Sequence, residues 1–125
     1  MNVIDSSGWL EYFINGNNAA FFARVIENTD DVLVPTISLF EVFKRVLIEK
    51  NRNDALEAVA IMKDGRVVDL DDSLALVAAE LSYEMKLPMA DSIILATARA
   101  NDAILWTQDA HFKGMDGVKY IEKKP

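Results

Sequence analysis

The sequence predicts an α/β fold in which helices cover both faces of a parallel sheet. Short runs rich in apolar and β-branched residues alternate with longer segments of helical periodicity along the whole chain. Strands joined through helices pair in parallel, which gives a three-layer α/β/α arrangement. The 125 residues suit one domain, and no linker or internal repeat divides them. We therefore expect residues 1–125 to form a single domain.

The predicted strands are short and rich in β-branched or aromatic residues. The first, Met1–Ile4, is an apolar run that ends at Asp5-Ser6-Ser7-Gly8, a sequence typical of a turn or helix cap. The others are Asp31–Pro35, Arg66–Asp69, Ala103–Trp106 and Val118–Ile121. These segments predict a sheet of about five strands.

The predicted helices are the segments with apolar residues at helical spacing. They are Ser7–Phe13, Ala19–Asn28, Ile37–Lys50, Asp54–Lys63, Ser73–Lys86 and Pro88–Ala100. With a further helical element before the last strand, the predicted order is β-α-α-β-α-α-β-α-α-β-α-β. Asp69, Asp71 and Asp72 precede one of these helices and are interpreted as caps or first-turn acids.

The composition limits the chemistry that is open to the chain. A hydrophobic fraction of 51% and a charged fraction of 26% are typical of a soluble globular protein. The absence of cysteine excludes disulfides, thiolate zinc sites and cysteine nucleophiles, so a metal would be held by oxygen or by the single histidine, His111. There is neither a signal-peptide pattern nor an apolar run of membrane-spanning length, so we expect a cytoplasmic protein without a membrane partner.

The charge balance is acidic: 13 Lys and Arg against 20 Asp and Glu give a net charge of −7. Such a charge argues against broad nonspecific binding to a polyanion such as RNA. Acids gathered into a metal site would remove the conflict, because bound divalent cations reverse the local field that a phosphate meets.

Two acids come just after predicted strands. Asp5 comes after the first strand, and Asp109 follows Trp106-Thr107-Gln108 at the end of the fourth. Ligands of open parallel sheets bind beyond the carboxyl ends of the strands, so both acids are candidates for a site. For each residue alone, a helix N-cap is the simpler interpretation.

Asp91 shares a helical face with Leu87, Ile94 and Leu95. An ionised carboxylate on an apolar face must be paired, coordinate a metal or become neutral. The alternative is that Pro88 begins the helix, which places Asp91 in the first turn, where the helix dipole favours an anion.

Glu41 lies inside the predicted helix Ile37–Lys50, one turn before Lys44 and Arg45. A surface ion pair with either residue is the simpler interpretation of Glu41 alone. Taken together, the four acids favour a shared site over four structural roles, because they come from four separate segments. Four carboxylates suit a hard cation such as Mg²⁺ or Mn²⁺. For His111 we expect a packing or surface role, since no second ligand of its kind lies at metal-binding spacing.

Four segments of the chain resemble PIN-domain proteins, most closely the VapC-like toxins. They are Val3-Ile4-Asp5-Ser6-Ser7, Ser38-Leu39-Phe40-Glu41-Val42, Ala90-Asp91-Ser92-Ile93-Ile94-Leu95-Ala96-Thr97-Ala98 and Thr107-Gln108-Asp109-Ala110-His111-Phe112. Each segment is weak evidence alone, whereas their order and spacing together are specific.

The resemblance implies a parallel sheet of order 3-2-1-4-5 and a metal-dependent endoribonuclease that hydrolyses RNA phosphodiester bonds. It implies that Mg²⁺ or Mn²⁺ is held by an acidic quartet, namely Asp5, Glu41, Asp91 and Asp109. Ser6 and Thr107 occupy positions where the family often carries a supporting hydroxyl. The resemblance also implies the toxin role of a type II toxin–antitoxin pair, with a VapB-like antitoxin as partner, and a homodimer.

Other functions fit the residues less well. A phosphatase of the haloacid-dehalogenase type needs a second Asp two residues after the first, where this chain has Ser7. A response-regulator receiver domain needs paired acids after the first strand, which Asp5-Ser6 does not supply. A PIN-like module that binds RNA or protein without cutting is the remaining alternative, although four intact acids argue against it.

Overall fold

The computed structural model describes residues 1–125 and contains one parallel five-stranded sheet in the order β3-β2-β1-β4-β5. The strands are β1 (Asn2–Ile4), β2 (Val32–Pro35), β3 (Arg66–Val68), β4 (Ile104–Thr107) and β5 (Val118–Tyr120). The predicted fold class and strand order are confirmed.

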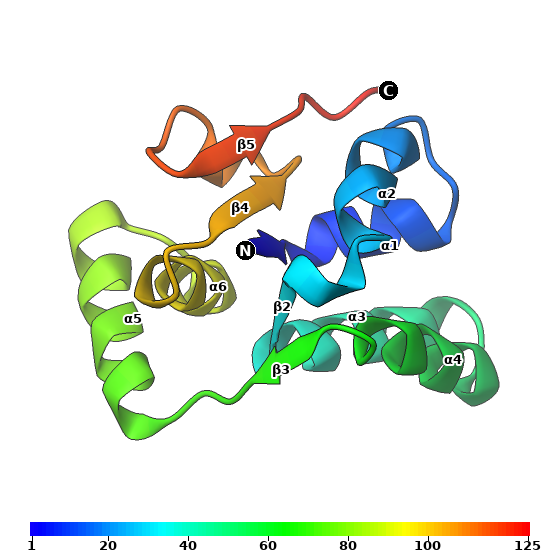
Figure 1. Ribbon diagram of the computed structural model, residues 1–125, viewed down its shortest axis with the longest axis horizontal. Helices are drawn as coiled ribbons and strands as arrows, with labels where there is room; N and C mark the ends of the chain where they lie inside the picture. Colours follow the sequence, from blue (N-terminus) through cyan, green and yellow to red (C-terminus); the bar gives the residue numbers. More distant parts are fainter.

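The helices cover both faces of this sheet. They are α1 (Ser6–Phe13), α2 (Ala19–Ile26), α3 (Thr36–Glu49), α4 (Arg52–Met62), α5 (Asp72–Met85) and α6 (Met89–Ala100). Helices α5 and α6 lie on one side, and α1 to α4 lie on the other (Figure 1). None of the helices combines the length and the apolar character needed to span a bilayer.

The central strands supply both hydrophobic cores, because successive side chains of a strand point to opposite faces. On β1, Val3 packs toward α6, and Ile4 packs toward α1 and α2. On β4, Leu105 packs in the same core as Val3, and Trp106 packs in the same core as Ile4. Strands buried on both faces explain why the apolar runs in the sequence are continuous rather than alternating.

The observed boundaries lie within two residues of the predicted ones. Helix α4 begins earlier than expected because the Asn51 side chain accepts a hydrogen bond from the backbone N–H of Asp54, at 2.8 Å. The helical element expected before the last strand is only a 3₁₀ turn, η2 (Ala110–Phe112). The chain turns away from η2 at Gly114, whose φ of +81° favours glycine. A second 3₁₀ turn, η1 (Thr29–Asp31), precedes β2.

The carboxyl edge of the sheet collects the ends of several elements. Ile4 of β1 lies opposite Trp106 of β4, so Asp5 and the residues after Thr107 leave the sheet side by side. Helix α3 starts at the same edge, directly after β2. Helix α6 leads back to the start of β4, so its first turn also lies at the carboxyl edge. The fold thereby brings four separate segments to one place.

Candidate metal centre

A cleft of about 380 Å³ opens at this edge of the sheet. Its walls come from the start of α1, from α3, from the first turn of α6 and from the segment after β4. The lining residues are Asp5, Ser6, Ser7, Leu10, Phe40, Glu41, Lys44, Arg45, Ile48, Asp91 and Asp109. All four acids of the quartet line this one cleft.

Asp5 is the most buried member of the quartet, with 3% of its surface exposed. It occupies the N-cap position of α1, yet its side chain makes no capping hydrogen bond. Instead, Oδ2 accepts hydrogen bonds from the hydroxyls of Ser7, at 2.7 Å, and Thr107, at 3.0 Å. The N-cap interpretation therefore describes the position of Asp5 but not the use of its carboxylate.

The environment of Asp5 disfavours its charge. Burial raises the pKa of Asp5 to about 6, and the negative charges of Asp91 and Asp109 act in the same direction. The hydroxyls of Ser7 and Thr107 oppose this shift only in part. A cation beside Asp5 would restore the preference for the ionised form.

Thr107 connects two members of the quartet. Its hydroxyl donates to Asp5 and accepts a hydrogen bond from the backbone N–H of Asp109 at 2.9 Å. The hydroxyl is fully buried, so its direction is set by these partners. Thr107 thus fits the supporting position that the resemblance implied. Ser7 donates to the same carboxylate but was not among the predicted residues.

Glu41 projects from α3 and is half-buried. Its Oε1 accepts a hydrogen bond from the Ser6 hydroxyl at 2.8 Å. Burial, followed by the charges of Asp91 and Asp109, raises the pKa of Glu41, and the Ser6 hydroxyl opposes the shift. The surface ion pair considered for Glu41 is absent, because Arg45 pairs with Glu49 at 2.7 Å instead.

Asp91 lies in the first turn of α6, three residues after the N-cap residue Pro88, as the helix-dipole interpretation required. Its side chain is nevertheless only 14% exposed and faces the cleft. Burial raises the pKa of Asp91, and the charge of Asp109 adds to this effect, while the contact with His111 lowers it.

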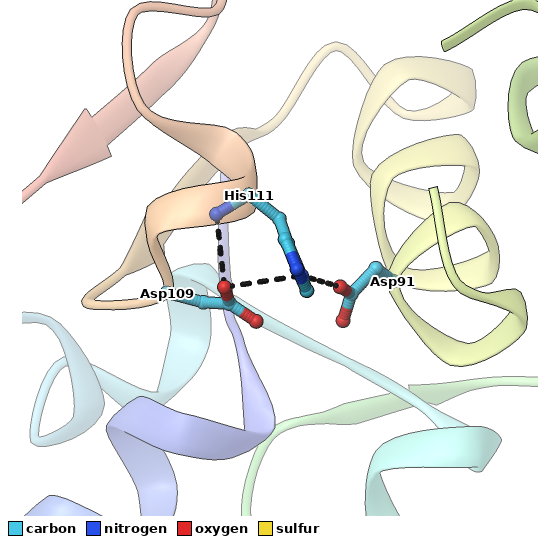
Figure 2. Close-up of side chains that lie close together, drawn as sticks. All are labelled: Asp91, Asp109 and His111. Carbon is cyan, nitrogen blue, oxygen red and sulfur yellow. Dashed lines mark hydrogen bonds and ion pairs between the residues drawn. The ribbon is translucent and has the colours of Figure 1, made fainter. Parts of the chain in front are cut away.

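His111 lies between two carboxylates of the quartet (Figure 2). Its Nδ1 is 2.7 Å from Oδ2 of Asp91 and 3.2 Å from Oδ1 of Asp109. These contacts raise the pKa of His111, with the hydrogen bond to Asp91 as the largest cause. The surface location expected for His111 is correct, at 56% side-chain exposure, but its contacts join it to the site. The spacing Asp109-Ala110-His111 after a strand was the available signal.

Asp109 organises the η2 turn that carries His111. Its Oδ1 accepts a hydrogen bond from the backbone N–H of His111 at 2.9 Å, which is the capping contact expected for Asp109 alone. The same carboxylate lines the cleft, so the cap and a site role are compatible. By contrast, Asp71 only caps α5, through a 2.8 Å hydrogen bond from the backbone N–H of Leu74, as its position predicted.

No lysine or arginine pairs with any member of the quartet. The ion pairs of the molecule are Arg45 with Glu49 and His111 with Asp91 and Asp109. Asp91, Asp109 and His111 each offer a ligand atom, and these atoms lie within 4.8 Å of one another. Asp5 and Glu41 line the same cleft but are not part of this close group. Carboxylate oxygens suit a divalent cation such as Mg²⁺ or Mn²⁺. The residues present therefore fit the implied metal.

The fold and this cluster define a class of protein: a parallel α/β protein with a candidate cation site in a carboxylate-lined cleft at the carboxyl edge of its sheet. The chain belongs to the PIN domain family, whose model matches residues 3–118. No curated protein matches the sequence.

Three solved structures illustrate the likeness. A toxin–antitoxin complex from Klebsiella pneumoniae is 21% identical with a TM-score of 0.78, and the match covers 95% of this chain and 96% of that chain. VapC20 from Mycobacterium tuberculosis, described as a sarcin–ricin loop cleaving toxin, is 18% identical with a TM-score of 0.77 over 100% of both chains. VapBC2 from Rickettsia felis, bound to a promoter DNA fragment, is 15% identical with a TM-score of 0.73 over 97% of both chains. These likenesses show a shared fold.

Proposed function

We propose that residues 1–125 form one domain that acts as an endoribonuclease dependent on Mg²⁺ or Mn²⁺. One observation carries this proposal: four carboxylates from four segments face one cleft, and none of them forms an ion pair with a lysine or arginine. Uncompensated charge of this kind destabilises a fold, so a binding function is the better explanation for keeping it. A divalent cation supplies the missing charge.

Each residue has a defined part in holding the cation. Asp5, Glu41, Asp91 and Asp109 provide the carboxylate oxygens, while Ser7 and Thr107 orient Asp5. Ser6 orients Glu41 in the same way. When bound, the cation would supply positive charge both for the scissile phosphate and for the water that attacks it. Metal-ligating carboxylates that are themselves hydrogen-bonded keep a fixed direction.

RNA is the substrate that we propose for this site. Lys44 and Arg45 line the cleft from α3, and Lys44, which forms no ion pair, supplies local positive charge that the net charge of −7 does not, whereas Arg45 is paired with Glu49. The description of VapC20 as a toxin that cleaves the sarcin–ricin loop supports an RNA target for this fold. Such a substrate would place the protein in the cytoplasm.

Cleavage of single-stranded or structured RNA tests the proposal. We expect cleavage with Mg²⁺ or Mn²⁺ and none with EDTA. Asp91→Asn should reduce the rate by roughly 100-fold or more, the scale of losing one electrostatic group at a reacting centre. Asp72→Asn is the matched control, because Asp72 is a first-turn acid of α5 that does not line the cleft.

Two outcomes would contradict the nuclease. Unchanged cleavage in excess chelator would show that the reaction does not require a metal. Metal binding without cleavage of any RNA would instead identify a PIN-like module that binds without cutting. Circular dichroism and thermal unfolding of Asp91→Asn distinguish loss of chemistry from loss of fold.

We further propose that a VapB-like antitoxin inhibits the protein as its toxin. An apolar groove of about 240 Å³ adjoins the cleft, and Leu10 lines both. The groove is bounded by α1, α3 and α4, with Phe13, Ile14 and Ile61 among its apolar residues. An amphipathic antitoxin helix fits such a groove, and an arginine beside it would pair with the quartet. The VapBC complexes among the similar structures support this partner.

Calorimetry with the cognate antitoxin tests the arginine contact. Replacing Asp5 and Asp91 together by Asn should weaken binding, because the paired hydrogen bonds to carboxylate are lost. Rising salt should weaken it only in part, since the apolar contact is not screened. Equal affinities for wild type and the double variant would show that inhibition uses another surface.

Finally, we propose that the protein is a homodimer that associates through the outer face of α5 and α6. This face exposes Leu76, Tyr83 and Met89, whose exposed fractions are 68%, 86% and 69%. It also contains a shallow apolar hollow between the two helices, lined in part by Tyr83 and Met89. Exposed apolar surface of this extent is typical of an interface.

A further inference from the structure

The position of His111 carries an inference beyond the acidic quartet. Its Nδ1 stands between Asp91 and Asp109, at 2.7 and 3.2 Å from their oxygens. In Figure 2 the ring nitrogen points into the gap between the two carboxylates. The imidazole therefore occupies a place that a cation held by Asp91 and Asp109 would have to share.

The distances are those between neighbouring ligands of one ion. An octahedral ion with bonds of about 2.1 Å keeps adjacent ligand atoms about 3.0 Å apart. The two nitrogen–oxygen distances, 2.7 and 3.2 Å, lie on either side of that value. Both contacts of Nδ1 therefore have the spacing of adjacent ligands, and the ligand atoms of Asp91, Asp109 and His111 all lie within 4.8 Å of one another.

The backbone holds His111 in this place. The segment Asp109-Ala110-His111 forms the start of the η2 turn, and Asp109 caps it through the backbone N–H of His111. The side chain is 56% exposed, so Nε2 can keep its proton in contact with water. With the proton on Nε2, a neutral imidazole presents the Nδ1 lone pair to a metal.

We propose that His111 is a direct ligand of the cation, through Nδ1, and that it shifts the preference of the site from Mg²⁺ toward Mn²⁺. This inference rests on the proposed cation site. Imidazole suits transition metals, whereas Mg²⁺ selects oxygen ligands. On binding, Nδ1 releases its proton to solvent and Nε2 carries the remaining ring proton, so the imidazole binds as a neutral ligand.

The single histidine makes the test unambiguous, because any imidazole nitrogen that couples to bound Mn²⁺ belongs to His111. Electron spin-echo envelope modulation of the Mn²⁺-loaded protein should show ¹⁴N coupling in wild type and none in His111→Ala. Calorimetry should show that this variant binds Mn²⁺ roughly 10-fold or more weakly, the scale of loss of groups around a metal. Its affinity for Mg²⁺ should change less.

His111→Gln is the matched variant, since an amide can still donate a hydrogen bond to Asp91. If His111 only positions the carboxylates, glutamine restores the Mn²⁺ affinity; if His111 is a ligand, it does not. Mn²⁺ binding by wild type without ¹⁴N coupling, or tighter binding by His111→Ala, overturns the inference and leaves the cation site standing. Equal Mn²⁺ binding by wild type and Asp91→Asn overturns the proposed site itself.

Discussion

Asp5 shows most clearly that the carboxylates of the cleft are unfavourable to ionise in the folded protein without metal. It is nearly fully buried, it faces two other acids, and only two hydroxyls stabilise its charge. Because the pKa is raised, the folded chain binds a proton at Asp5 more tightly than the unfolded chain does. Without metal, ionised Asp5 therefore destabilises the protein, and this effect depends on pH.

The pH dependence gives the first prediction. The folded pKa of about 6 exceeds the ordinary value of 3.8, so the free energy of unfolding of the metal-free protein should fall as pH rises between these values. The loss is at most about 3 kcal/mol, from 1.36 kcal/mol per pKa unit. Urea unfolding in EDTA should show Asp5→Asn gaining over wild type as pH rises from about 4 to about 7.

Two comparisons test whether Asp5 causes this pH dependence of stability. His111, whose raised pKa acts in the same direction, is present in both proteins and its effect should largely cancel. Saturating Mn²⁺ should reverse the order of stability, since a ligand stabilises the fold that binds it and Asp5→Asn lacks one carboxylate. A stability difference that is independent of pH would show that Asp5 is not titrating in this range.

The convergence of the four acids on one cleft could be predicted from sequence, whereas part of their hydrogen bonding could not. A carboxylate that follows an apolar strand, or that shares a helical face with leucines, is visible as a residue type in an unusual place. The partner of a hydroxyl depends on its rotamer and on segments far away in the chain. Ser7 and His111 were therefore missed, although both adjoin predicted residues. Ser6 and Thr107 were found only through the resemblance.

At the scale of the element, α1 packs closely against α2 and β1 at Gly8. A Cβ atom at Gly8 would lie 2.6 Å from Cε1 of Phe22 on α2 and 2.7 Å from Cγ2 of Ile4 on β1. Glycine at this position lets α1 approach the sheet closely enough for Ser6 and Ser7 to reach Glu41 and Asp5. The site thus depends on the spacing between two elements as well as on its own residues.

We predict that Gly8→Ala weakens both the fold and the site. Alanine favours a helix by about 1 kcal/mol over glycine, but overpacking a tight contact costs roughly 1–3 kcal/mol. The clash should therefore dominate in denaturant unfolding, and displacement of α1 should lower Mn²⁺ affinity. Gly117→Ala is the control: its φ of +76° makes it strained without any nearby atom, so stability should fall while metal affinity is kept. Unchanged metal affinity in Gly8→Ala would show that α1 adapts.

The existence of each regular helix and strand could be predicted from periodicity, while their ends could not be fixed to a residue. Ends are set by single hydrogen bonds, such as the one from the backbone N–H of Asp54 to Asn51, which moves the start of α4. The η2 turn was expected only as an unspecified helical element. Three residues are too few to show a period, so this turn is visible only through its capping aspartate, Asp109.

At the scale of the whole molecule, two apolar surfaces lie on different sides of the sheet. One is the groove beside the cleft, which includes Ile14, and the other is the outer face of α5 and α6, which includes Met89. A protein that binds both a second copy and an inhibitor needs two such surfaces, and the proposed assignment gives each surface one partner.

Paired charge substitutions test that assignment. We predict that Met89→Lys, at a side chain that is 69% exposed, shifts a dimer toward monomer in sedimentation analysis, because a buried lysine at the interface is unpaired. Ile14→Lys, at 62% exposure, should leave the dimer intact and weaken antitoxin binding instead. Neither change should alter the monomer fold. If the dimer survives Met89→Lys but not Ile14→Lys, the groove is the dimer interface and the assignment proposed here is wrong.

The strand order could not be derived from periodicity alone. Hydrophobic patterns show that strands are parallel and buried, but they do not show which strands are neighbours. The order came from the resemblance, which also placed β3 at an edge, away from the cleft. The structure confirms that edge and leaves Asp69 and Asp71 outside the cleft.

The central position of β1 has a consequence for how the protein is made. β1 precedes the other four strands in the chain, yet it pairs with β4 across about a hundred residues, through contacts such as the hydrogen bond from the backbone N–H of Asp5 to the carbonyl of Trp106. Such long-range pairing cannot form until most of the chain is present. Asp5 and Asp109 therefore meet only after β4 has been synthesised. During synthesis the chain carries Asp5, Glu41 and Asp91 before Asp109, so the four carboxylates cannot line one cleft until the segment after β4 has left the ribosome.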